Sequence, residues 1–256
     1  MQDTALGQSD AAIESYRRVL ELDGENAEAL DALARLHEQA EQWSDLVSVL
    51  STRVHTMEDL DQALQLRKRI GEVQEKQLGD AAAAIETYKD ILATESTDRD
   101  ALHALERLYL DGGSVEDYLE TLESELDATA DVEEQLGIYD RMVAVVLERT
   151  EDPERAAELL EKTILLAPQR EASYVKLEEI YRGMSRWSEF TETCRSHVEA
   201  IDDPSAKITV LMGLGEVLEK EVEDIDRAID TYREVLELDE DHFDAANAMS
   251  LSLIHI

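Results

Sequence analysis

A repeat of 72 residues constrains this chain more than any other feature of its sequence. The segment LARLH at 33–37 returns as LERLY at 105–109 and as LEEIY at 177–181. The segment AIESYRRVL at 12–20 has counterparts at 84–92, 156–164 and 228–236, with no insertion between copies. Copies that share one register must bury the same face against their neighbours, so the repeat predicts a stacked array of similar units.

Within each copy the apolar residues fall at the spacing of an α-helix. Leu30, Leu33 and Leu36 form one such series, and polar breaks such as 23–26 and 202–204 separate the series. Gly (10) and Pro (3) are scarce, and no segment alternates long enough to predict a strand, so we expect an all-α chain. The expected helices lie near 10–22, 26–40, 43–56, 60–78, 80–93, 98–110, 115–127, 131–149, 153–166, 170–183, 187–201, 204–221, 225–238 and 242–250.

The repeat resembles the tetratricopeptide repeat. In the segment 27–50, Leu30, Leu33, Ala34 and His37 stand at the family's Trp, Leu, Gly and Tyr positions. The segment 12–23 resembles the family's second helix, with Ala12 as its small residue, and alanine returns there in every later copy. The resemblance covers residues 5–249. It implies a right-handed superhelical solenoid of antiparallel helix hairpins.

The chain departs from the family in its spacing. Core positions are 37 residues apart from Leu33 to Ile70 and 35 apart from Ile70 to Leu105, where a simple tetratricopeptide repeat has 34. Each copy therefore contains two unlike hairpins, and we expect the extra residues to lengthen the helices near 60–78, 131–149 and 204–221. We predict one solenoid over 1–250, with copies at about 1–58, 59–130, 131–202 and 203–250.

Both ends of the chain interrupt the pattern. Leu6 and Gly7 match Leu78 and Gly79, so we expect an earlier helix to end there and the helix at 10–22 to lack its hairpin partner. The tail LSLIHI at 251–256 departs from the acidic, alanine-rich style and resembles a translated sequencing-library adapter, CTG TCT CTT ATA CAC ATC. We interpret 251–256 as non-native, with a genuine amphipathic tail as the alternative, and the chain as a fragment of a larger protein.

The formal net charge of −37 narrows the classes of partner. A surface this acidic repels nucleic-acid phosphates and anionic lipids, so we expect neither nucleic-acid nor membrane binding, while basic partners are attracted. Solubility or a salt-rich habitat would also explain the acidity. No signal peptide is visible, which favours a cytoplasmic location, although a periplasmic or surface location follows if a signal preceded Met1.

Catalytic and cofactor motifs are missing from the sequence. Neither GxxxxGK[ST], GxGxxG nor HExxH occurs, so we expect no enzyme activity and no cofactor. The segment SYVK at 173–176 matches SxxK, but Tyr174 aligns with core Leu30, so the match is accidental. Gly215 aligns with Gly71 inside a predicted helix and is interpreted as a packing position.

The candidate metal ligands are also explained by the repeat, so we expect no metal. Cys194 aligns with Leu50 and Leu122 and is predicted to be buried, while His197 is predicted to face solvent. The acidic run at 239–244 lacks the glycine of a calcium loop and is interpreted as a helix-initiating turn. The recurrent aromatic residues are predicted to pack in the core rather than line a ligand site: Trp43, Trp187, Tyr16, Tyr88 and Tyr232.

The resemblance places a partner-binding groove on the first helix of each hairpin, which lines the concave surface in this family. The family's carboxylate clamp of Lys, Asn and Arg is not implied, because its places hold Asp31, His103 and Val175. We expect extended peptides or helices with basic or amphipathic character as ligands. The groove positions are Glu28, Asp31, Arg35, Glu38, Lys68, Glu72, Glu75, Asp100, His103, Arg107, Asp140, Glu179, Arg182, Met212, Glu216 and Glu219.

The function that follows is a protein–protein interaction scaffold, within a larger protein of bacterial style. Two alternatives stay open at this point. The solenoid could be a structural spacer, or it could be an accessory region of an enzyme or signalling protein whose active domain lies outside this sequence.

Overall fold

The computed structural model describes the backbone of residues 2–254 and the side chains of residues 9–252. Contacts divide the chain into two compact units, 1–129 and 130–256. The helices of unit 1 are α1 (Gln2–Leu22), α2 (Ala27–Gln39), α3 (Trp43–His55), α4 (Leu60–Lys76), α5 (Ala81–Thr94), α6 (Arg99–Gly112) and α7 (Val115–Ala128). The helices of unit 2 are α8 (Val132–Arg149), α9 (Pro153–Leu166), α10 (Glu171–Gly183), α11 (Trp187–Ala200), α12 (Pro204–Lys220), α13 (Ile225–Leu238) and α14 (Phe243–Ile254).

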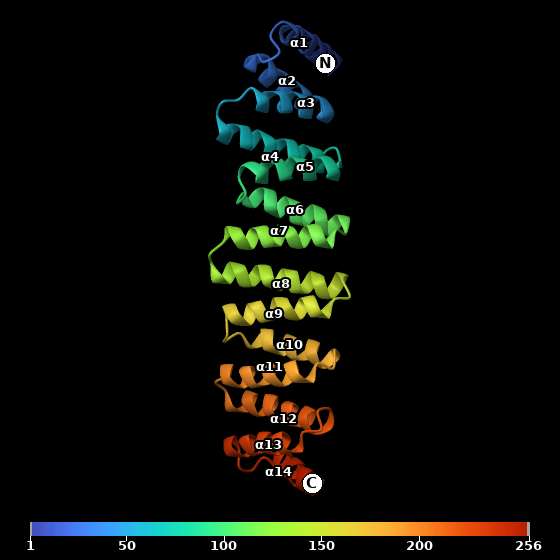
Figure 1. The fold of residues 1–256 in the computed structure, drawn as a ribbon. Coiled ribbons are helices and arrows are strands. Elements are labelled where there is room, and N and C mark those ends of the chain that lie inside the picture. The colour runs from blue at the N-terminus through green and yellow to red at the C-terminus, as the bar shows by residue number, and fades with distance from the viewer. Residues whose placement is uncertain (1, 255–256) are drawn as a thin grey trace. The chain divides into compact units, whose positions relative to one another are not determined.

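The expected all-α helical repeat is confirmed, since residues 2–254 contain helices and turns but no strand. Inside each unit every helix packs against the next one in sequence, as Figure 1 shows. The hairpins are α2/α3, α4/α5 and α6/α7 in unit 1, and α8/α9, α10/α11 and α12/α13 in unit 2. In the part of the chain that is described, no helix has the length and apolar character needed to cross a bilayer.

The alternation of unlike hairpins is confirmed by helix lengths. The first helices α4, α8 and α12 have 17, 18 and 17 residues, whereas α2, α6 and α10 have 13, 14 and 13. The extra residues therefore lie where the spacing predicted them. The division of 1–250 into four copies and the right-handed superhelix stay predictions.

A recurrent aspartate starts the second helix of each long hairpin. The carboxylate of Asp80 accepts a hydrogen bond from the backbone N–H of Ala83, and Asp152 and Asp224 do the same three residues ahead, at 3.0–3.1 Å. This N-cap satisfies a backbone donor that the helix itself leaves unpaired. Its recurrence explains why the 72-residue pattern keeps an aspartate at these exposed positions.

The predicted core positions are buried. Leu33, Leu105 and Leu177 are at most 2% exposed, and the small residues Ala84 and Ala156 are fully buried. Gly71 lies against the ring of Tyr88, where a Cβ would come within 2.8 Å of Cζ, which confirms the packing role proposed for this position and for Gly215. The other predicted aromatic core residues range from buried to half-buried: Tyr232, Tyr16, Trp43 and Trp187.

The first and last helices are longer than predicted. Helix α1 runs from Gln2 without a break, so the expected helix end at Leu6 and Gly7 is wrong. The reason is that Gln8 stands where the other copies carry the capping Asp80, and glutamine is not a helix N-cap residue. Helix α14 continues to Ile254, into the segment interpreted as non-native. Residues 255 and 256 of that segment lie outside the described residues.

His197 is buried, so the prediction that it faces solvent is wrong. Its side chain is 3% exposed, and Nδ1 lies 2.7 Å from Oε1 of Glu178. Its ring stacks on Tyr174, with ring centres 5.0 Å apart. The cause is Glu178, which stands where the first copy has Ala34 and brings a carboxylate into the hairpin. Cys194 is buried as predicted, and burial raises the pKa of its thiol.

Candidate functional site

Five of the predicted groove residues come together in one pocket of unit 1. The pocket has a volume of about 620 Å³ and lies on the first helices α4 and α6, with Tyr88 of α5 beneath them. Because the side chains of adjacent first helices share this face, sequence positions about thirty residues apart become neighbours. The predicted residues that line it are Lys68, Glu72, Asp100, His103 and Arg107.

Lys68 links α4 to the start of α6. Its Nζ lies 2.7 Å from Oδ2 of Asp98 and 2.6 Å from Oδ2 of Asp100. Burial favours the neutral amine, but the hydrogen bonds to Asp100 and Asp98 outweigh it and raise the pKa of Lys68. The hydrogen bond and positive charge of Lys68 lower the pKa of Asp100. Lys68 is therefore a fixed positive charge held between two carboxylates.

Arg107 and Arg69 extend this network across the first helices. Arg107 donates two hydrogen bonds to the carboxylate of Glu75, at 2.9 and 2.8 Å, in the bidentate geometry that fits a guanidinium to a carboxylate. Arg69 pairs with Glu38 of α2 at 2.5 Å. Tyr88 lies beneath these charges, and its burial, with the carboxylates of Glu75 and Glu72, raises its pKa to about 12. The tyrosine is neutral at physiological pH.

His103 lies at the edge of the pocket and contacts α7. Its Nε2 is 3.3 Å from Oε1 of Glu125. Together with Glu106, these residues place three possible metal-ligating atoms within 4.8 Å of one another, a grouping that the sequence analysis did not single out. Glu106 and Glu125 have further polar or charged neighbours.

Of the groove residues of α2, Glu38 contacts the pocket through Arg69, and the other three lie apart from it. Asp31 forms an ion pair with Arg53 of α3, at 3.1 Å. It also lines a separate pocket of about 450 Å³ with Met57 and Leu66. Arg35 donates to the backbone oxygen of Asp31 at 3.3 Å. Glu28 is exposed on the first turn of α2.

The groove residues of unit 2 make local pairs. Asp140 of α8 accepts two hydrogen bonds from Arg170, at 3.1 and 2.6 Å. The other five occupy varied settings along α10 and α12. Arg182 lies over the ring of Phe190, and Glu216 forms an ion pair with Lys220. Glu219 accepts a hydrogen bond from the hydroxyl of Tyr232. Met212 is half-buried and Glu179 is exposed.

The sequence analysis missed several residues of these networks. Asp98 and Arg170 precede a helix, and the repeat aligns them with each other and with Asn26, so the sequence analysis read them only as helix starts. A signal was nevertheless present, because Lys68 and Asp140 also align, and both pairs carry opposite charges. The remaining missed residues of the α4–α6 pocket are Gln65, Arg69, Lys76, Tyr88 and Ala104.

Comparison with known proteins places the chain among helical repeat proteins. The family model described as tetratricopeptide repeat matches residues 4–26 and 208–242, which correspond to α1 and to the hairpin α12/α13. Among curated proteins, none is similar enough to the chain to count as a match.

Several solved structures are similar in fold at low sequence identity. The crystal structure of MamA protein is 20% identical, with 71% of this chain and 94% of that chain covered and a TM-score of 0.39. The C-terminal part of a TPR repeat-containing protein from Cytophaga hutchinsonii is 14% identical, with 94% and 95% covered and a TM-score of 0.40. The thermophilic TPR protein TTC0263 of Thermus thermophilus is 22% identical, with 75% and 99% covered and a TM-score of 0.33. The two family-model matches identify tetratricopeptide repeats in α1 and in the hairpin α12/α13, and the remaining hairpins of the described chain share the same helical repeat fold.

Proposed function

We propose that this protein is a non-catalytic interaction scaffold, and that the pocket on α4 and α6 binds a peptide segment with basic and apolar residues. The observation that carries the proposal is the convergence of five predicted groove residues on that one pocket. Repeat arrays bind partners on such faces because each unit adds one more set of side chains to a continuous surface.

The charges of the pocket support a basic ligand. The carboxylates of Asp100 and Glu72 pair with Lys68 and Lys76 but are still 78% and 59% exposed, so part of each stays accessible to a partner's cations. Lys68 and Arg107 are each held by carboxylates of the protein itself, at 2.6–2.9 Å, and are therefore less available to an acidic ligand. The net charge of −37 adds a long-range attraction for basic segments.

Fluorescence anisotropy with a short labelled peptide of lysine, leucine and glycine tests this proposal. We expect binding at low salt that weakens as salt is added, and no binding of the matched peptide with glutamate in place of lysine. The double variant Glu72→Gln/Asp100→Asn should weaken binding about fivefold, since each exposed ion pair contributes modestly.

The matched control removes the same charge from a different surface. Glu123→Gln/Asp127→Asn changes two exposed residues of α7 and should leave the affinity within error of the unmodified protein. If both double variants weaken binding equally, the attraction is a property of total charge and the pocket has no special role. If neither peptide binds at low salt, the structural-spacer alternative is favoured.

A further inference from the structure

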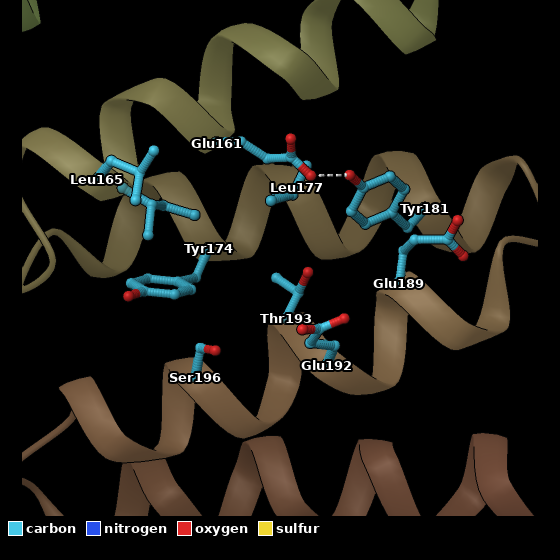
Figure 2. Close-up of a pocket in the computed structure, with 10 residues that line it drawn as sticks. Glu161, Leu165, Tyr174, Leu177, Tyr181, Glu189, Glu192, Thr193 and Ser196 are labelled. Atoms are coloured by element: carbon cyan, nitrogen blue, oxygen red, sulfur yellow. Dashed lines mark hydrogen bonds between the residues drawn. The ribbon is translucent and has the colours of Figure 1, made fainter.

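A second pocket lies over helix α10 in unit 2, and we call it the α10 pocket (Figure 2). It has a volume of about 370 Å³ and opens between the second helices α9 and α11. Its floor is formed by Tyr174, Leu177 and Tyr181 of α10, each at most 3% exposed. Leu165 of α9 lies at the rim and is 82% exposed. The pocket thus has a buried, partly aromatic floor and an exposed apolar residue, Leu165, at its rim.

The rim of the α10 pocket is acidic. Three of its ten lining residues are glutamates, Glu161 of α9 and Glu189 and Glu192 of α11, and none is Lys or Arg. Glu189 already forms an ion pair with Arg186, at 2.5 Å. Glu161 accepts a hydrogen bond from the hydroxyl of Tyr181, at 2.5 Å. Within the described part of the chain, neither Glu161 nor Glu192 forms an ion pair with Lys or Arg. Two carboxylates therefore face the pocket without a cation of the protein.

The repeat shows that Glu161 is unusual at its position. Steps of 72 residues align it with Arg17 of α1, Lys89 of α5 and Arg233 of α13. Each of those three residues is a cation, and Glu161 carries the opposite charge. One tyrosine of the floor and the acid of the far rim have counterparts in unit 1, because Tyr181 aligns with Tyr109, and Glu189 aligns with Asp117 and Asp45.

In unit 1 the corresponding place is served by the protein's own cation. The ammonium of Lys89 lies 5.7 Å from the centre of the Tyr109 ring, within the range of a cation–π contact. Its interaction with Tyr109, together with the charges of Glu86 and Asp117, raises the pKa of Lys89.

The first copy also has a cation at this position, Arg17, although His37 stands in place of the tyrosine. Arg17 reaches from α1 toward α3, and its Nη2 lies 3.7 Å from Oδ1 of Asp45. A cation between the second helices is thus a recurring part of the hairpin junction. In the α10 pocket the chain places the carboxylate of Glu161 at this position instead. Arg186 lies over the Tyr181 ring, 5.3 Å from its centre, and pairs with Glu189, so Glu161 and Glu192 are the carboxylates left for a cation from outside.

We propose that the α10 pocket binds an arginine or lysine side chain of a protein partner at the carboxylates of Glu161 and Glu192, since Glu161 replaces the Lys89 and Arg17 of the other copies. The aliphatic stem would lie along Leu165 and Tyr174, and the charged group would pair with Glu161 and Glu192. Arginine fits this surface better than lysine, since a planar guanidinium both stacks on an aromatic ring and binds carboxylates. This site is distinct from the groove proposed above, because it lies on other helices and in the other unit.

The probe is the blocked tripeptide Ac-Leu-Arg-Leu-NH2, titrated into the ¹⁵N-labelled protein and followed by backbone amide shifts. We expect saturable shifts at residues of α9, α10 and α11 that line the pocket. The same peptide with citrulline in place of arginine keeps the shape but loses the charge, and should bind about tenfold more weakly. Equal binding of the two peptides would overturn the proposal, as would shifts confined to α4 and α6.

Variants taken from the protein's own repeat make the test specific. Glu161→Lys reproduces the residue of unit 1 and should fill the pocket, so binding of the arginine peptide should fall at least about tenfold. The control Glu240→Lys makes the same charge change on the exposed turn between α13 and α14, and should retain binding. Comparable losses in the two variants would show a general charge effect and contradict the proposal.

The reciprocal variant tests for a gain of binding. Lys89→Glu removes the resident cation of unit 1 and should create a second set of saturable shifts in α5, α6 and α7. Circular dichroism of each variant checks that the helices are intact. If free arginine amide produces the same shifts and affinity as the tripeptide, the pocket is a small-molecule site, and the proposal of a protein segment fails.

Discussion

The hairpins α4/α5 of unit 1 and α8/α9 of unit 2 hold the same place in the repeat but fill it with different residues. In α4/α5, Gly71 faces the ring of Tyr88 at a distance that leaves no room for a Cβ. In α8/α9 the aligned residues are Val143 and Leu160, both 1% exposed. The very small Gly71 and the large Tyr88 of α4/α5 are thus replaced in α8/α9 by Val143 and Leu160, which are both of intermediate size. The close approach of the helices depends on the combined volume of the pair rather than on either residue alone.

The same two regions differ in the direction of an ion pair. Lys68 of α4 pairs with Asp98, which begins α6, whereas Asp140 of α8 pairs with Arg170, which begins α10. The positive and negative positions are exchanged between the units. The exchange has a consequence for α10, since Asp98 caps α6 through the N–H of Ala101 but Arg170 provides no side-chain cap. The repeat preserves the contact between successive first helices and leaves its chemistry variable.

The largest expected effect comes from mixing the two packing solutions. Gly71→Val places methyl groups against the buried Tyr88 ring, and should lower the free energy of unfolding by about 3 kcal/mol. Urea unfolding followed by circular dichroism measures the change. The companion variant Gly71→Val/Tyr88→Leu reproduces the pair of unit 2 and should recover more than half of the loss. If the double variant is as unstable as the sum of the two single variants, combined volume does not govern this contact.

A second prediction uses the difference between α6/α7 and α10/α11. Position 197 is histidine in unit 2, and its unit 1 counterpart is Glu125. His197→Ala removes the buried partner of Glu178 and the ring stacked on Tyr174, so it should lower the free energy of unfolding by about 2 kcal/mol. Removing both partners with Glu178→Ala/His197→Ala should cost less than the two single changes added together. Strictly additive losses would show that the pair is not coupled.

A third prediction exchanges the charges of one junction. Lys68→Asp brings a third carboxylate beside Asp98 and Asp100, and should lower the free energy of unfolding by about 1 kcal/mol. Adding Asp98→Arg restores an opposite pair in the orientation of unit 2, although it removes the N-cap of α6. The double variant should therefore be about 1 kcal/mol more stable than the sum of the single variants predicts. A coupling energy near zero would mean that the two ion pairs contribute nothing to their junctions.

Most of the fold could be predicted because the repeat reports burial several times over. Leu33, Leu105 and Leu177 each identify the same core position, and the recurring Asp80 identifies a helix start. Prediction failed where one copy changed its chemistry. At Gln8 the cap was lost and α1 continued, and His197 turned inward to the half-buried carboxylate of Glu178. The alignment of His197 with Arg53 and Glu125 did not reveal its burial, because that burial depends on a contact with Glu178 of another helix.

The candidate site was predictable in a more limited way. The alignment with family groove positions identified Lys68, Asp100 and Arg107, which do share a pocket. It gave no information on which charges neutralise each other, since partners such as Asp98 and Glu38 lie about thirty residues away on other helices. The α10 pocket was missed because the sequence analysis treated second helices as packing elements. The reversed charge of Glu161 within the series Arg17, Lys89 and Arg233 was the available signal.

The smallest expected effect concerns acid and distinguishes the two units once more. Lys68 lowers the pKa of Asp100, and unit 2 has Ala172 at the aligned position. A carboxyl whose pKa is lower in the folded state stabilises the fold above its unfolded pKa, about 3.9, and this stabilisation is lost as pH falls through the folded pKa. Asp100→Asn should therefore cost about 0.3 kcal/mol at neutral pH, a small value because the side chain is 78% exposed and screened by solvent.

That cost should disappear when the pH is lowered below the folded pKa of Asp100, and urea unfolding of both proteins across this range measures it. The control is the same substitution in a Lys68→Met background, where the carboxyl has lost the cation that lowers its pKa. In that background, Asp100→Asn should cause no pH-dependent change in the free energy of unfolding, since the Lys68–Asp100 pair is absent. A cost that persists unchanged in acid, or that survives Lys68→Met, would show that Asp100 stabilises α6 through its position in the first turn, where any carboxylate favours the helix N-terminus. In that case unit 1 and unit 2 would differ at this junction in helix-end electrostatics rather than in an ion pair between helices.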